Sequence, residues 1–192
     1  MTNKEKFIEI FRENISREGS SELLSWLEKT DFFTAPASTK FHLCVEGGLC
    51  EHSINVYECL KERYGNEHSA ESIAIVALLH DLCKAQFYKV STRNQKNEIT
   101  GQWEKVPFYQ IEDKFPFGHG EKSVFLIERF MRLKLEEAIA IRWHMGGFDD
   151  SAKSGGFTVS NAFEMYPLAV KLHIADIEAT YLREGEKSSE NI

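Results

Sequence analysis

The sequence lacks an excess of basic residues. Its 192 residues include 23 lysines and arginines against 30 aspartates and glutamates, so the formal net charge is −7. A protein that coats nucleic acid needs a positive surface to neutralise many phosphates, so this balance argues against a stable complex with duplex nucleic acid. A small phosphorylated substrate remains compatible with an acidic chain, because a bound metal can supply positive charge locally.

The sequence also lacks long apolar segments. No run approaches the roughly 18 apolar residues that a membrane-spanning helix needs. The N-terminal stretch MTNKEKFIEIFREN has no apolar core of the kind that a signal peptide contains. We therefore expect a cytoplasmic protein that does not bind a membrane.

Cysteine pairs of the CxxC type are absent as well. The four cysteines are Cys44, Cys50, Cys59 and Cys83, and each lies in a helix-like, mostly apolar context. The missing CxxC spacing argues against a zinc ribbon or zinc finger. The apolar contexts favour buried, reduced thiols over disulfide bonds.

The length and the hydrophobic pattern indicate one mainly α-helical domain. With 42% hydrophobic residues, a chain of this length can bury a core without disulfides or a structural metal. We predict a single domain over residues 1–183, with N-terminal helices over 1–34 and a flexible tail over 184–192. Aromatic and β-branched residues flank a polar stretch within 86–116, which predicts a β-hairpin inserted between helices.

Helical periodicity predicts five more helices beyond residue 34. They cover about residues 48–63, 70–83, 120–132, 136–144 and 166–183. The helix over 70–83 is apolar nearly all round, so we expect it to be the central, buried helix. Residues 145–160 are rich in glycine and serine, and we expect them to form a loop.

Four of these helices carry a histidine or an aspartate on an apolar face. The residues are His52, His80, His144 and Asp176. A single inward histidine is most simply a hydrogen-bonded core residue, but burying several such groups is costly unless they are paired or bind a cation. Mixed imidazole and carboxylate ligands suit Mn²⁺, Fe²⁺, Co²⁺, Ni²⁺ or Zn²⁺, with Mg²⁺ as a further candidate. The absence of thiolate ligands favours a catalytic site over a closed structural zinc site.

The order of these residues resembles a known family. The segments GGLCEH, ALLHDLCK and LHIADIEATYL contain the pattern H…HD…D, formed by His52, His80, Asp81 and Asp176, and Lys84 completes an HDxxK motif. This pattern resembles the HD-domain superfamily of metal-dependent phosphohydrolases. The resemblance implies that the single domain is an HD-type helical bundle, with a divalent-metal site at the four residues of the pattern and hydrolysis of phosphoester bonds by metal-activated water. It also makes Asp81 and Lys84 the candidate catalytic residues.

Two further histidines extend the resemblance, which covers about residues 41–182. His119 in FGHGEKS and His144 in RWHMGGFD resemble the additional ligands of HD proteins that bind two metals. Such proteins include HD-type phosphodiesterases and the HD domains of 3′-5′ exoribonucleases. By this resemblance, Asp81 bridges two metal ions, one also held by the rest of the H…HD…D pattern and the other by His119 and His144.

Basic residues near the motifs are candidates for binding a substrate phosphate. They are Lys84, Lys122, Arg142 and His42, although Lys84 could equally be a solvated lysine at a helix C-terminus. We expect a nucleotide or short oligonucleotide substrate and favour phosphodiester over phosphomonoester hydrolysis. A one-metal 5′-nucleotidase or nucleoside triphosphohydrolase and an inactive nucleotide sensor remain alternatives. The oligomeric state stays open.

Four other residues admit both a functional and a structural interpretation. Trp103, Phe108 and Tyr109 of the hairpin could stack on a nucleotide base, but we favour the interpretation that they cover the core. His173 lies three residues before Asp176 on a neighbouring face of the same helix, and we interpret it as a structural residue.

Overall fold

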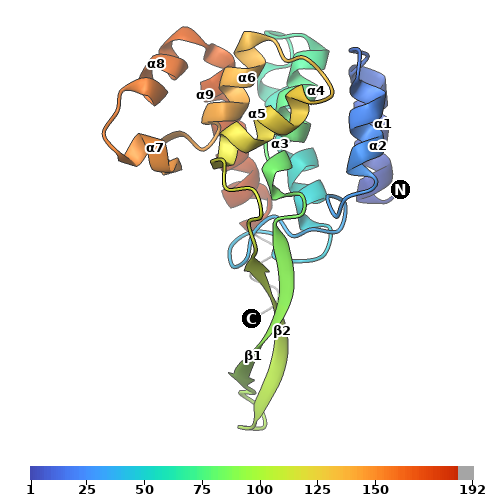
Figure 1. Ribbon diagram of the computed structural model, residues 1–192, viewed down its shortest axis with the longest axis vertical. Helices are drawn as coiled ribbons and strands as arrows, with labels where there is room; N and C mark the ends of the chain where they lie inside the picture. The colour runs from blue at the N-terminus through green and yellow to red at the C-terminus, as the bar shows by residue number, and fades with distance from the viewer. Residues whose placement is uncertain (186–192) are drawn as a thin grey trace.

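The computed structural model describes residues 1–185 and shows a mainly α-helical fold with one inserted β-hairpin, as predicted (Figure 1). The α-helices of this part are α1 Asn3–Asn14, α2 Ser20–Leu27, α3 Gly48–Tyr64, α4 Ala70–Leu79, α5 His119–Glu128, α6 Leu135–Trp143, α7 Asp150–Lys153, α8 Thr158–Met165 and α9 Pro167–Glu178. Short 3₁₀ turns follow α4 (η1, Leu82–Lys84) and α6 (η2, Gly146–Phe148), and a π-helical turn follows α9 (η3, Ala179–Arg183). Within residues 1–185, no helix is both long enough and apolar enough to cross a membrane.

Helix α4 lies at the centre of the helical body. It begins where the Ser69 side chain accepts a hydrogen bond from the backbone N–H of Ser72, and every residue from Ser72 to Leu79 is buried. Helices α1, α3 and α6 all pack against it. The helix stops at His80, because Asp81 leaves the helical region with φ −99° and ψ 20°. The predicted helix over 70–83 is thus divided into α4 and η1, and the His-Asp pair lies at the break inside the core.

The N-terminal helices belong to the same core. The Thr2 side chain caps α1 by accepting a hydrogen bond from the Glu5 backbone, and the Glu5 side chain accepts one from the Thr2 backbone. The ring centroids of Phe7 and Phe32 lie 5.2 Å apart, and both side chains are fully buried. Phe7 also belongs to the same buried hydrophobic cluster as Leu60 of α3 and Ile73 of α4, and α1 packs against both helices. Because burial of aromatic side chains is a large apolar contribution, the N-terminal segment stabilises the domain rather than forming a separate appendage.

The hairpin consists of β1 Tyr88–Lys96 and β2 Trp103–Ile111 and projects away from the helices (Figure 1). The strands are antiparallel, and their register runs from the pair Tyr88–Ile111 to the pair Lys96–Trp103. At the turn, the Asn97 side chain accepts hydrogen bonds from the two backbone N–H groups of Ile99 and Thr100. This local bonding pattern is typical of asparagine in turns.

The expectation that three hairpin aromatic residues cover the core is wrong for Trp103. Its side chain is 71% exposed, whereas Phe108 and Tyr109 are half-buried. The reason is its position in the register: Trp103 pairs with Lys96 at the end of the hairpin that lies far from the helices (Figure 1). Hydrophobicity alone therefore placed this side chain incorrectly.

The predicted loop over 145–160 is wrong as well, because it contains η2, α7 and the start of α8. Asp149 explains part of this order. Its carboxylate accepts a hydrogen bond from the Ser151 backbone, which caps α7, and it forms an ion pair with Arg142 at 3.0 Å. A side-chain cap and a contact to another helix outweigh the weak helical propensity of glycine and serine here.

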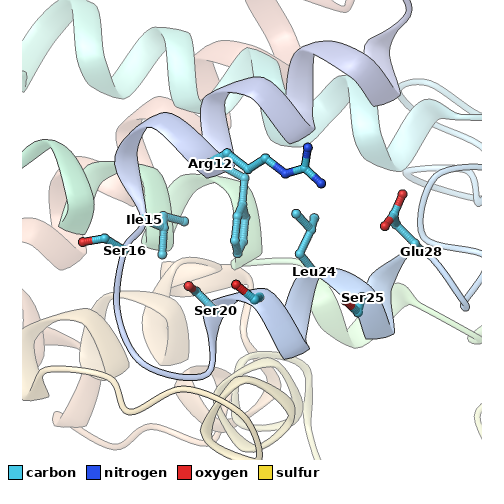
Figure 2. Close-up of a pocket in the computed structure, with 9 residues that line it drawn as sticks. Arg12, Ile15, Ser16, Ser20, Leu24, Ser25 and Glu28 are labelled. Atoms are coloured by element: carbon cyan, nitrogen blue, oxygen red, sulfur yellow. The ribbon is translucent and has the colours of Figure 1, made fainter.

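A groove between α1 and α2 lies outside the cluster of predicted metal ligands (Figure 2). Its volume is about 340 Å³. It is lined by Phe11, Arg12, Ile15, Ser16, Ser20, Ser21, Leu24, Ser25 and Glu28. None of the predicted ligands belongs to this lining, so the groove has no part in the metal chemistry that the motifs imply.

Candidate metal centre

The structure brings all six predicted metal ligands into one cluster, although they come from five separate helices. They are His52 on α3, His80 and Asp81 at the end of α4, His119 at the start of α5, His144 at the end of α6 and Asp176 on α9. Three of these positions are helix termini, where the chain changes direction inside the core. Side chains at helix ends can converge on one point, whereas the middle of each helix is occupied by packing contacts.

The Asp81 carboxylate lies at the centre of the cluster. Its Oδ1 atom is 2.8 Å from Nε2 of His119 and 3.6 Å from Nε2 of His144. Its Oδ2 atom is 3.5 Å from Nε2 of His80 and 3.7 Å from Nε2 of His52. The two carboxylate oxygens therefore face two different pairs of histidines.

Asp176 completes the group on the side of His52. Its Oδ1 atom is 3.2 Å from Nε2 of His52, and that nitrogen is 3.3 Å from Nε2 of His80. Three triplets of cluster residues have ligand atoms that all lie within 4.8 Å of one another: His52, His80 and Asp81; His80, His144 and Asp176; and Asp81, His119 and His144. The buried groups could thus hold metal ions, as the sequence predicted.

The hydrogen bonds of two histidines determine which ring nitrogen faces the cluster. Nδ1 of His80 donates to the carbonyl of Ala77 at 2.8 Å, and Nδ1 of His144 donates to the carbonyl of Ile141 at 2.7 Å. A carbonyl only accepts, so Nδ1 carries the proton and Nε2 presents a lone pair. Nε2 of His144 is buried and has no hydrogen-bond partner within residues 1–185. Buried polar atoms in a structural role are nearly always paired, so this nitrogen has the character of a metal ligand.

A glycine allows the second pair of histidines to approach each other. A Cβ atom on Gly120 would lie 2.2 Å from the carbonyl oxygen of Arg142, so the backbones of α5 and α6 touch at this point. His119 lies next to Gly120, and His144 lies two residues after Arg142; their ring centroids are 5.1 Å apart. Gly120 is therefore needed for the close packing that brings these two imidazoles together.

The charge on Asp81 is stabilised by its surroundings. Burial opposes the charged form, but Lys84, His80 and His119 outweigh it and hold the pKa of this carboxyl well below its usual range. Nζ of Lys84 lies 2.6 Å from Asp81 Oδ2, and only 14% of the Lys84 side chain is exposed. Lys84 is therefore not a solvated lysine at a helix end.

The histidines of the cluster differ in basicity. Burial lowers the pKa of His80 to about 3. Burial also opposes protonation of His52, but its hydrogen bonds with Asp176 and Glu184 raise the pKa to about 10. For His119, burial is likewise outweighed, by Cys83 and Asp81, and the pKa rises to about 10. Without metal, protons on His52 and His119 balance the buried carboxylates.

The predicted substrate-binding residues fall into two groups. Lys84 and His42 adjoin the cluster. The His42 ring centroid is 4.8 Å from that of His52, and both His42 ring nitrogens are buried with no hydrogen-bond partner in the described part of the chain. Lys122 and Arg142 are instead engaged by carboxylates. Lys122 lies 2.8 Å from Asp113, and Arg142 pairs with Glu121 at 2.5 Å and with Asp149.

Two residues that contact the ligands were not predicted from the sequence. Sγ of Cys83 lies 3.3 Å from Nδ1 of His119, and its place inside the HDxxK motif could have suggested this contact. Glu184 binds Nδ1 of His52 at 3.0 Å and is 1% exposed. The tail predicted over 184–192 is therefore wrong at its first residue, while residues 186–192 lie outside the described part of the chain.

The contacts of His173 agree with the prediction that it is a structural residue. Its Nδ1 atom donates a hydrogen bond to the carbonyl of His144 at 2.6 Å. This contact connects α9 to the end of α6, where a metal-ligand candidate lies. Among the described contacts, His173 thus helps to fix the backbone at His144.

Comparison with known proteins identifies no relative: no family model, no curated protein and no solved structure matches the chain. The resemblance to HD-domain phosphohydrolases therefore rests on the sequence motifs alone.

Proposed function

We propose that this protein is a divalent-metal phosphohydrolase of the HD-domain type that acts on a nucleotide-like or short oligonucleotide substrate. The observation that supports this most directly is the buried Nε2 of His144, which has no hydrogen-bond partner among the described residues and points into a cluster of three further histidines and two aspartates. A cluster with only structural roles would satisfy its polar atoms internally. Imidazole and carboxylate donors also fit divalent transition metals.

The arrangement of the six candidate ligands fits two metal ions better than one. Oδ2 of Asp81 faces His52 and His80, while its Oδ1 atom faces His119 and His144. Asp176 lies beside the first pair. We therefore propose that Asp81 would help to hold two ions, one together with His52 and His80 and one together with His119 and His144, since a single ion beside His52 and His80 would leave the second pair without a function.

Bound divalent metals would supply an activated water and would neutralise charge on a phosphoryl group. Lys84 adds a fixed positive charge beside Asp81, and we assign it to an oxygen of the substrate phosphate. His42, next to His52, is a second candidate for contact with substrate, because its ring nitrogens have no hydrogen-bond partner within residues 1–185. Cys83 is buried, so we assign it to orienting His119 rather than to nucleophilic attack.

Turnover of bis-p-nitrophenyl phosphate and p-nitrophenyl phosphate with Mn²⁺ tests the proposal, followed by a nucleotide and oligonucleotide panel analysed by chromatography. We expect hydrolysis, with the diester preferred, and none by the Asp81→Ala variant. Activity retained in Asp81→Ala would disprove the site assignment. If the metal-bound protein hydrolyses none of these substrates, the result would favour an inactive nucleotide sensor.

The number of metals per chain separates the two-metal proposal from its main alternative. Metal analysis after reconstitution should give close to two ions per chain. A value near one would instead favour a 5′-nucleotidase or nucleoside triphosphohydrolase that uses only His52, His80, Asp81 and Asp176.

A further inference from the structure

The end of the described chain covers one of the candidate ligands. Glu184 comes directly after η3 and is buried, with both carboxylate oxygens close to Nδ1 of His52, at 3.0 and 3.2 Å. Nδ2 of Asn55 donates a second hydrogen bond to Glu184 at 2.9 Å. Asn55 and His52 lie on the same helix, so the carboxylate is held over one turn of α3.

The π-helical turn explains why Glu184 reaches this position. In a regular α-helix, residues eight apart, such as Asp176 and Glu184, point in directions that differ by about 80°. A π turn takes up one additional residue and rotates the residues after it back by about 100°, which brings the two side chains to within about 20° of each other. The backbone N–H of Glu184 bonds to the carbonyl of Ala179, five residues earlier, as this turn requires.

As a result, two carboxylates approach opposite edges of one imidazole. Asp176 contacts Nε2 of His52 at 3.2 Å, and Glu184 contacts Nδ1. In contrast, Nδ1 of His80 and Nδ1 of His144 each donate to a neutral backbone carbonyl. A carboxylate partner makes the opposite nitrogen a stronger metal donor than a neutral carbonyl does.

Charged contacts on both sides of the π turn attach it to α3. Arg183 pairs with Glu58 at 3.1 Å and with Glu62 at 2.6 Å, and Arg63 forms an ion pair with Glu178. These contacts connect α3 to residues before and next to Glu184. The position of Glu184 therefore depends on the packing of η3 and not on its own hydrogen bonds alone.

We propose that Glu184 is a positioning residue of the metal centre: it accepts the Nδ1–H of His52 and holds the lone pair of Nε2 towards the metal. The inference depends on the proposed metal-dependent function, because the role of Glu184 has meaning only if His52 binds a metal. It makes the turn Ala179–Arg183 and the residue after it part of the site.

The test is isothermal titration of the full-length, metal-free protein with Mn²⁺, for the wild type and two variants. Loss of such an outer carboxylate typically weakens metal binding 10- to 100-fold. We expect Glu184→Gln, which keeps an acceptor oxygen but removes the charge, to weaken binding about 10-fold, and Glu184→Ala to weaken it further, towards 100-fold. The matched control is Glu28→Gln, which removes an ion-paired carboxylate outside α3, α9 and η3, where Glu28 pairs with Lys4 at 3.4 Å, and should leave the affinity unchanged.

A second measurement separates positioning from general damage to the fold. The ¹⁵N spectrum of the histidine rings in the Zn²⁺-loaded protein should show a proton on Nδ1 of His52 in wild type and in Glu184→Gln. Equal Mn²⁺ affinity of wild type and Glu184→Gln would overturn the inference while leaving the proposed function intact. A wild-type protein that binds no Mn²⁺ would overturn both.

Discussion

Two clusters of buried ionisable side chains differ in how completely their polar atoms are paired. In the first, Glu137 is fully buried, and each of its oxygens accepts two hydrogen bonds. Oε2 accepts from Arg17 at 2.6 Å and from the Lys134 backbone at 2.7 Å, while Oε1 accepts from Arg17 at 3.0 Å and from Ser72 at 2.7 Å. The Arg17 guanidinium also donates a hydrogen bond to the Glu71 carboxylate. This cluster is complete without any ligand.

In the second cluster the same degree of burial leaves polar atoms unpaired or facing like atoms. Within residues 1–185, Nε2 of His144 has no hydrogen-bond partner, and Nε2 of His52 faces Nε2 of His80 at 3.3 Å. The difference shows that buried charge by itself does not identify a functional site. Convergent ligand atoms with incomplete hydrogen bonding are a better guide to a candidate site, because a bound ligand can offset their desolvation.

The largest expected effect on stability comes from the first cluster, around Glu137. Glu137→Ala should lower the free energy of unfolding by about 3–5 kcal/mol, because it leaves Arg17 without its bidentate partner. Urea unfolding measures the change, with the exposed Glu9→Ala as control, for which we expect less than about 0.5 kcal/mol. A loss below about 1 kcal/mol for Glu137→Ala would contradict the view that this cluster is structural.

Variants in the two clusters should differ in how much bound metal stabilises the fold. At a free Mn²⁺ concentration of about 100 times the dissociation constant, the free energy of unfolding should rise by about 2.7 kcal/mol in wild type. The Glu137→Ala variant should show the same increment, measured by thermal or urea unfolding with and without metal. Asp81→Ala should show none. An equal increment in Asp81→Ala would mean that the stabilising metal binds elsewhere.

The pH dependence of metal binding is governed by His52 and His119, whose pKa values are raised to about 10 by their acidic neighbours and, for His119, by Cys83. Metal ligands must be deprotonated, so binding at neutral pH displaces these protons. The apparent affinity should therefore rise between about pH 7 and 10, by about tenfold per pH unit for each proton released. Titration calorimetry in buffers of different ionisation enthalpy counts the protons; zero release would refute this prediction.

The smallest effect is expected outside both clusters. Trp103→Ser, near the exposed end of the hairpin, should change the free energy of unfolding by no more than about 0.5 kcal/mol and leave Mn²⁺ affinity unchanged. The same unfolding and calorimetric measurements apply. A large loss of stability would show that the Trp103 side chain makes contacts that its 71% exposure does not suggest.

The candidate ligands could be predicted from sequence because helical periodicity and the HD motif both report local features. His52, His80 and Asp176 each fall on an apolar face, and such faces turn inward in a helical domain. Lys122 and Arg142 were less predictable. Both lie near motif residues in sequence, but their ion pairs depend on carboxylates whose positions are set by loop conformation.

The sequence by itself determined the hairpin and most of the helices, because these depend on hydrophobic periodicity. Periodicity also pointed to His52, His80, His144 and Asp176, whereas Asp81 and His119 were named only by the resemblance to HD domains. Only the tertiary structure decided that the two oxygens of Asp81 face different histidines and that His144 has an unpaired nitrogen. It also decided that Glu184 contacts His52. That contact depends on a π turn that changes the helical phase, and on the packing of η3 against α3, neither of which periodicity reveals.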